Sequence, residues 1–346
     1  GSDPRRRRDR GEGRPVSGRR DWLARLYAGG VTPASFLPDA SVGKTAESEE
    51  IPGSGVELVE DDELRVHPVT RTDPPAGLAF LDGIQQWKVI GYDGVTPIAF
   101  AHVAAAVRRV GSNRRLVTAA MGSRDLVLAP ESALTDERRR AIDAAGLEPV
   151  PVAVDPGQPA AAIEALRRAV HHERQSLEKT LGEAAVQQLG QDQWLVVDGQ
   201  LAVSGVLARH ARTVGVIKSH GAQFLEGRHL ERALTVPAGH RTSVFRVVGG
   251  HGRTAVHSWY LRLWPWEGHD LHYGLLRVEM RAHVDAIAQA SWVGGWLVAL
   301  RAPLAAPDAR VDRLLYPVHD VETFLRSRAP RDLLASPASR LPRTGT

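Results

Sequence analysis

Two apolar segments that each end in Asp-Gly decide the expected fold: AFLDG at residues 79–83 and WLVVDG at residues 194–199. Uninterrupted apolar runs of this length are typical of strands that are buried on both faces of a sheet. The glycine that follows lets the backbone turn away or lets a ligand approach closely. We therefore expect Asp82 and Asp198 at the ends of two buried strands, with converging carboxylates if the strands are neighbours.

The segments around these two strands indicate a mixed α/β domain, because hairpins are followed by a long helix and then by further strands and helices. An Asp-Gly turn at residues 93–94 predicts a hairpin. Thr135 is the expected N-cap of one helix, and Pro159 the expected start of a long one. The predicted strands are 78–81, 86–91, 96–103, 116–120, 126–128, 194–197, 214–217, 243–248, 256–264 and 275–280. The predicted helices are 21–27, 135–145, 159–189, 229–234, 283–300 and 318–327.

The composition excludes several classes of protein. Apolar residues make up 43% and charged residues 24% of the 346-residue chain, which is typical of a globular protein and not of a disordered or fibrous one. Cysteine is absent. A disulfide framework, a thiolate zinc site, an iron–sulfur cluster and a cysteine nucleophile are therefore excluded. The longest apolar stretch, 286–300, is too short to span a bilayer. We expect a soluble, cytoplasmic protein with no membrane partner.

The net charge of +4 is distributed unevenly along the chain. The excess of arginine lies before residue 21 and after residue 325, so that the body between them is mildly acidic. We divide the chain into a basic disordered tail (1–20), an N-terminal helix and extended arm (21–76), the main domain (77–328) and a basic disordered C-terminal tail (329–346). The tails, more than the body, are then expected to attract nucleic acid.

Converging carboxylates repel one another, and a divalent cation with oxygen ligands relieves the repulsion. The helix between the two Asp-Gly segments offers a third carboxylate, from Glu173, Glu178 or Glu183. The simpler interpretation is that the Asp-Gly pairs are ordinary turns and that the glutamates lie on a solvated helix face.

Two further segments carry charges beside predicted strands. Lys218 follows the apolar run VGVI, where an ammonium group can contact a phosphate. Arg277 and Glu279 alternate with apolar residues in LLRVEM, so they share one strand face and either pair with each other or line a groove.

The order of these motifs resembles the NurA family of nucleases, which are partners of HerA-type DNA translocases. The resemblance covers residues 77–325 approximately. It rests on FLDG at Asp82, the helical segment LRRAVHHERQSLE, VVDG at Asp198, VGVIKS at Lys218, GLLRVEM at Arg277 and LLYP at Tyr316.

This resemblance implies an RNase H-like fold, with a mixed five-stranded sheet and flanking helices, in a homodimer. It implies a Mn²⁺- or Mg²⁺-dependent deoxyribonuclease that works with a hexameric HerA-type ATPase in DNA repair or antiviral defence. The implied catalytic and metal-binding residues are Asp82, Glu173 and Asp198, with Glu178 as the alternative helical glutamate. Lys218 and Arg277 are expected to contact DNA, and Tyr316 to position the strand.

The sequence departs from the family pattern at one place. The histidine that should follow the Tyr-Pro pair by two helical turns falls near Phe324, so His319 is the expected replacement as metal ligand or proton carrier. The alternative is a DNA-end clamp or translocase adaptor with little or no catalytic activity. A third interpretation is a metal-dependent phosphatase or an unrelated α+β enzyme.

Overall fold

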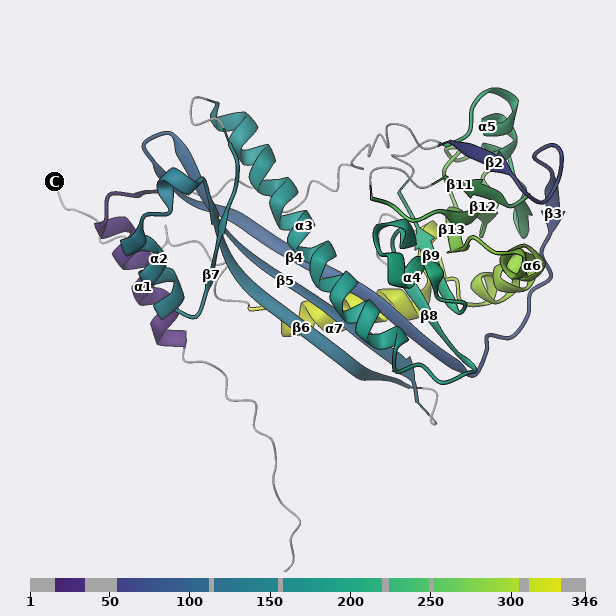
Figure 1. Ribbon diagram of the computed structural model, residues 1–346, viewed down its shortest axis with the longest axis horizontal. Helices are drawn as coiled ribbons and strands as arrows, with labels where there is room; N and C mark the ends of the chain where they lie inside the picture. The colour runs from purple at the N-terminus through teal and green to yellow at the C-terminus, as the bar shows by residue number, and fades with distance from the viewer. Residues whose placement is uncertain are drawn as a thin grey trace, which may run out of the picture.

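The computed structural model describes residues 16–34, 55–111, 115–154, 158–219, 224–248, 252–304 and 311–330. Figure 1 shows a long molecule in which helices flank one continuous sheet. The predicted α/β class is confirmed at this level. Most of both predicted basic tails lies outside the described residues. Within the described part of the chain, no helix combines the length and the apolar character needed to cross a membrane.

The sheet is mixed, with parallel and antiparallel neighbours. Its strands run in the order β2 (Val56–Leu58), β11 (Phe245–Val247), β12 (Val256–Arg262), β13 (Leu275–Arg281), β9 (Thr213–Ile217), β8 (Gln193–Asp198), β4 (Gly77–Asp93), β5 (Thr96–Val110), β6 (Leu116–Ala129) and β7 (Glu148–Pro151). Three short strands lie off this path: β1 (Thr32–Pro33), β3 (Val66–Pro68) and β10 (His240–Thr242).

The helices are α1 (Val16–Ala28), α2 (Asp136–Ala144), α3 (Pro159–Val186), α4 (Gly205–Arg209), α5 (Gly227–Leu234), α6 (Val284–Ala299) and α7 (Tyr316–Arg328). Short 3₁₀ turns occupy Glu131–Ala133, Leu201–Val203 and Val311–Arg313. The predicted cap of α2 is confirmed, because the Thr135 hydroxyl accepts a hydrogen bond from the Arg138 amide. Pro159 begins α3 as expected, since its fixed φ suits the first helical turn.

Strands β4, β5 and β6 form a long antiparallel meander. The predicted hairpin turn is confirmed: Gly94 has φ +61° between β4 and β5. The expected end of the first strand at Asp82 is wrong, because β4 continues through Asp82-Gly83 to Asp93. The reason is that β5 pairs with β4 along this whole stretch, and a cross-strand ladder outweighs the local turn tendency of Asp-Gly. Likewise β6 is one strand where two were predicted.

The N-terminal arm contributes strands of its own to the sheet. β1 pairs with β4, β2 extends the sheet beyond β11, and β3 pairs with β10. Sequence patterns did not predict these strands, because segments of two or three residues carry no usable alternation. The arm is therefore tied to the main domain at both ends of the molecule in Figure 1.

Side chains of β4 alternate between two apolar layers. Leu78, Phe80 and Ile84 pack with α6 and α7, whereas Ala79 and Leu81 belong to the core next to α3. Figure 1 shows α3 on one side of β4–β6 and α7 on the other. Because successive residues of a strand point to opposite faces, Asp82 belongs to the α7 side and Gly83 to the α3 side.

Candidate functional site

Asp82 and Asp198 lie next to each other on parallel neighbouring strands. The register pairs Phe80 with Val196 and Leu81 with Val197, so the next residues in line are the two aspartates. Val196 belongs to the same apolar layer as Phe80, and alternation then puts both carboxylates on the α7 side of the sheet. The predicted convergence of the two segments is therefore present, although only the second aspartate ends a strand.

Asp82 is a buried carboxyl group, with 6% of its surface exposed. Burial raises the pKa of Asp82 well above its usual range, and the nearby Asp198 carboxylate raises it further. Lys218 opposes these effects, while Glu178 and Glu322 add to them. One oxygen, Oδ1, accepts a hydrogen bond from the Gly83 amide at 2.7 Å. An ionised Asp82 carboxylate therefore has too little positive charge around it, and a bound cation would stabilise it.

Lys218 lies at the end of β9, directly beside the two aspartates. Its Nζ donates to Asp198 Oδ2 at 2.7 Å, and the side chain is almost fully buried. Arg313 donates from Nη1 to the Lys218 backbone carbonyl at 3.2 Å. The predicted position of Lys218 beside the carboxylates is therefore confirmed, and Arg313 is a second cation near it that the sequence did not suggest.

The helical carboxylate at this site is Glu178, and Glu173 lies elsewhere. A Cβ on Gly83 would lie 2.3 Å from Glu178 Oε1, so the missing side chain of Gly83 is what lets Glu178 reach β4. Burial raises the pKa of Glu178, Asp198 adds to this, and the ion pair with Arg174 opposes it. The Glu173 carboxylate instead binds Arg124.

The first choice among the helical glutamates therefore needs correction, with Glu178 in place of Glu173. Five residues are about 140° apart around an α-helix, so the two cannot both face β4. Arg174 also belongs to the site. Burial lowers the pKa of its guanidinium, but the nearby carboxylates of Glu178, Asp82 and Asp198 outweigh this effect and raise it.

Helix α7 brings a fourth carboxylate that the sequence analysis missed. Glu322 is largely buried and lies close enough to Asp82 to raise the pKa of that carboxyl. The sequence could have indicated Glu322, because it lies beside Val318, Val321 and Leu325, which form the buried face of α7. Phe324, which stands where the family pattern has a histidine, packs under the guanidinium of Arg108.

The other two α7 residues take different positions. Tyr316 begins the helix and is 60% exposed, which suits contact with a large ligand. His319 is partly buried, and its Nδ1 atom has no hydrogen-bond partner. Within the described part of the chain, no hydrogen bond or ion pair joins either residue to Asp82 or Asp198.

Arg277 lies inside the protein and not on a surface, where its predicted contact with DNA would require it. It is 2% exposed and forms an ion pair with Glu279 at 2.8 Å. Its guanidinium packs over the Phe224 ring, and Glu279 also accepts a hydrogen bond from the Leu201 amide. The alternation of charges in LLRVEM therefore reflects an internal ion pair, one of the two alternatives that the sequence left open.

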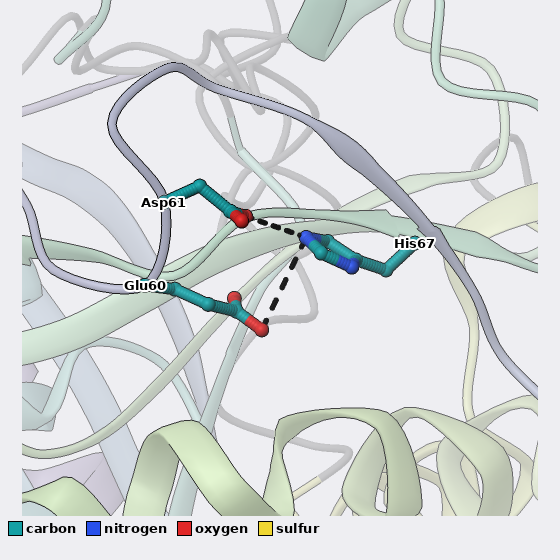
Figure 2. Close-up of side chains that lie close together, drawn as sticks. All are labelled: Glu60, Asp61 and His67. Atoms are coloured by element: carbon teal, nitrogen blue, oxygen red, sulfur yellow. Dashed lines mark hydrogen bonds and ion pairs between the residues drawn. The ribbon is translucent and has the colours of Figure 1, made fainter.

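A separate acidic group consists of Glu60 and Asp61, between β2 and β3, and His67 in β3. Figure 2 shows Glu60 and Asp61 converging on His67. Their ligand atoms lie within 4.8 Å of one another, as in a metal site. The Glu60 carboxylate, however, already receives both Arg241 nitrogens at 2.7 Å, and Asp61 Oδ2 accepts from Ser243 and lies 2.8 Å from His67 Nε2. These bonds join the arm to β10 and explain the group without a metal ion.

The candidate site is therefore the set Asp82, Glu178, Asp198 and Glu322 with the cations Lys218 and Arg174. Among the described residues, only Glu60, Asp61 and His67 bring three possible ligand atoms within 4.8 Å of one another. The carboxylate oxygens of Asp82, Glu178 and Asp198 are therefore farther apart than this. Oxygen donors of this kind suit Mg²⁺ or Mn²⁺. Comparisons with known proteins give no match, either to a protein-family model or to a curated protein.

Proposed function

We propose that this chain is a metal-dependent DNA nuclease of the NurA type, which hydrolyses phosphodiester bonds at the site around Asp82 and Asp198. One observation carries the proposal: these two carboxylates, 116 positions apart in the sequence, are neighbours on parallel strands in a buried setting that raises the pKa of Asp82. Buried carboxyl pairs of this kind, with a perturbed pKa, are common at sites that bind a ligand or transfer a proton.

The strand order supports an RNase H-like domain. The resemblance implies a mixed five-stranded sheet with flanking helices, and β6, β5, β4, β8 and β9 are consecutive strands of mixed direction with α3 and α7 on opposite sides. The aspartates lie on the central pair, β4 and β8.

The donor set fits a divalent cation in its chemistry. Asp82 and Asp198 would hold the ion from the α7 side of the sheet. Glu178 would reach it from the α3 side past the end of β8, since the β4–β8 pairing stops at Leu81 and Val197. Glu322 would take the metal-ligand role expected of His319. Lys218 now neutralises Asp198 and Arg174 neutralises Glu178. A bound cation would replace the Lys218–Asp198 ion pair. The chemistry that Mn²⁺ or Mg²⁺ supplies at such a site is polarisation of a phosphate oxygen and a lower pKa of a water molecule.

The remaining residues would bind and orient the DNA strand. Once released from Asp198, the Lys218 ammonium can donate to a phosphate oxygen, and Arg313 extends the positive charge behind it. Arg174 holds the Glu178 carboxylate in place beside Gly83. Exposed Tyr316 at the start of α7 would position the strand. His319 Nδ1 would accept or deliver a proton at the same helix end.

The wider setting of the activity follows the same resemblance. The proposed partners are DNA, a HerA-type hexameric ATPase and a second copy of the chain, in the cytoplasm, for end resection in repair or for antiviral defence.

Purified protein should degrade linear DNA when Mn²⁺ is added and should stop when the ion is chelated. Gel analysis of labelled single-stranded, duplex and mononucleotide substrates measures this directly. Cleavage of DNA but not of mononucleotides supports the proposal. Turnover of mononucleotides alone would instead indicate a phosphatase, and DNA cleavage that survives chelation would contradict the metal dependence.

The alternative, a weakly active or inactive DNA-end clamp or adaptor of the translocase, is favoured by Phe324 in the place of the family histidine. The wide spacing of the three carboxylates also favours it. This alternative predicts a complex with the ATPase but no heat of Mn²⁺ binding in calorimetry and no DNA cleavage.

A further inference from the structure

A row of polar side chains crosses the β4–β6 meander on the α7 side of the sheet. The register sets Gln86 of β4 opposite His102 of β5, and His102 opposite Asp125 of β6. Lys88 lies two residues beyond Gln86, so it points to the same side as Gln86 and Asp82. Gln86, Lys88 and His102 are called the polar group below.

The polar group separates two apolar layers on that side of the sheet. Ile84 belongs to the layer that contains Leu325 of α7. Ile90 belongs to the layer that contains Trp22 of α1. Figure 1 shows α1 near the hairpin end of the meander and α7 farther along it. The polar group therefore lies between the parts of the meander that these two helices cover.

Each member of the polar group has a polar atom without a partner in the described part of the chain. Gln86 Oε1 is buried and accepts no hydrogen bond. Burial lowers the pKa of Lys88, and no carboxylate offsets this effect. His102 is 7% exposed, and Asp125 binds its Nδ1 atom at 2.7 Å, which leaves Nε2 available. Buried polar atoms are nearly always paired, so several unpaired ones together indicate a ligand.

The chemistry of the polar group suits an anionic oxygen. The Lys88 ammonium has a full charge and three donors, and the Gln86 amide can turn to present its two N–H donors. When both ring nitrogens are protonated, His102 donates from Nδ1 to Asp125 and from Nε2 to a ligand. Charge-assisted hydrogen bonds of this kind are the ones that hold phosphate groups.

We propose that the polar group binds a backbone phosphate of the DNA strand whose scissile phosphodiester lies at the Asp82 site; this rests on the proposed function. Asp82 and Lys88 are six residues apart on one strand face, which is about 20 Å at ~3.3 Å per residue. That length corresponds to about six nucleotides of a base-stacked strand.

The route between the two sites follows β6. The cross-strand row of Asp82 ends on β6 at Met121, and Ser123 is the next residue on the same face. Met121 is 39% exposed and Ser123 is also exposed, whereas Ile84 on β4 is buried. A strand that leaves the Asp82 site therefore reaches the polar group over β6, alongside α7.

Lys88→Met tests the contact, and fluorescence anisotropy with a labelled single strand and a chelator measures binding without cleavage. The substitution should raise Kd about tenfold, because one charged hydrogen bond is lost, and should reduce the slope of log Kd against log salt by about 0.7. Tm should not fall, since the lysine that is removed has no partner. His102→Gln should weaken binding in the same direction.

Lys179→Met is the matched control, because Lys179 is an exposed lysine of α3, on the opposite side of the sheet. It should leave Kd and the salt slope unchanged. Disulfide trapping then locates the strand, because the chain contains no cysteine. Lys88→Cys should cross-link to an oligonucleotide that has a thiol group on one backbone phosphate, and Lys179→Cys should not.

Equal DNA affinity of Lys88→Met and wild type would overturn the proposal, and so would a wild type that binds no DNA. Loss of inorganic phosphate binding in calorimetry with DNA affinity kept would also overturn it, because the polar group would then be a separate anion site. Weaker DNA binding by Lys88→Met in a protein that cleaves no DNA would support this contact and contradict the nuclease activity. Cleavage by wild type with an unaltered affinity of Lys88→Met would do the reverse.

Discussion

Asp82→Asn should abolish Mn²⁺-dependent DNA cleavage, with a loss of about a hundredfold or more, since one lost charge contact to a metal or transition state is worth ~3 kcal/mol. The amide keeps the shape of the side chain but carries no charge, so it binds a divalent cation poorly. Asp198→Asn should have a similar effect. Initial rates on labelled DNA at saturating Mn²⁺ measure both. Cleavage at wild-type rate in either variant would remove that aspartate from the site.

The same substitution should make the metal-free protein more stable. Burial and Asp198 raise the pKa of Asp82, so the folded state holds a proton that the unfolded chain has already lost. Stability therefore falls as pH rises from the unfolded pKa of about 3.9 toward the raised folded pKa. The amide does not titrate, and near neutral pH we expect a gain of about 1–2 kcal/mol, the typical cost of an unsatisfied buried polar group.

Thermal melts with a chelator present measure this gain. The difference in Tm between Asp82→Asn and wild type should widen as the pH rises above the unfolded pKa of about 3.9. Asp93→Asn is the control for loss of a β4 carboxylate, because Asp93 is at the hairpin turn, where Asn-Gly is equally suitable, and it pairs with Arg138 instead of with the site. It should leave cleavage unchanged. A Tm difference that stays constant across pH would show that the fold does not raise the pKa of Asp82.

Glu178→Gln should reduce cleavage about a hundredfold, while Glu173→Gln should change it less than about threefold. Glu178 reaches β4 through the space above Gly83 and shares the electrostatic field of Asp82 and Asp198, whereas the Glu173 carboxylate is held by Arg124. Both residues lie on α3, both are largely buried and both pair with an arginine, so the two variants are matched chemically.

Rates on one DNA substrate, together with Tm for each variant, separate catalysis from folding. The substitution at Glu178 should leave Tm within a few degrees of wild type. If Glu173→Gln is the inactive variant and Glu178→Gln is active, the helical residue has been assigned to the wrong turn of α3.

The sequence predicted the parts of the fold that depend on local chemistry. The Asp93-Gly94 turn, the Thr135 cap and the Pro159 start of α3 are all where the residues indicate. The adjacency of Asp82 and Asp198 was also predictable, because two strongly apolar strands compete for the centre of one sheet.

Features that depend on distant partners were not predictable. The local turn signal at Asp82-Gly83 is overridden by the ladder with β5. Which glutamate of α3 enters the site depends on a gap at Gly83, and Glu322 enters only because α7 packs on β4. The burial of Arg277 was not predictable, because an internal ion pair has the same strand alternation as a charged groove.

The location of a bound ion tests the central claim most directly. Crystals of the protein grown with Mn²⁺ should show an anomalous-scattering peak in contact with the carboxylates of Asp82 and Asp198, and the Lys218 ammonium should have moved off Asp198. A peak only at Glu60, Asp61 and His67, or an unchanged Lys218–Asp198 ion pair at saturating Mn²⁺, would contradict it.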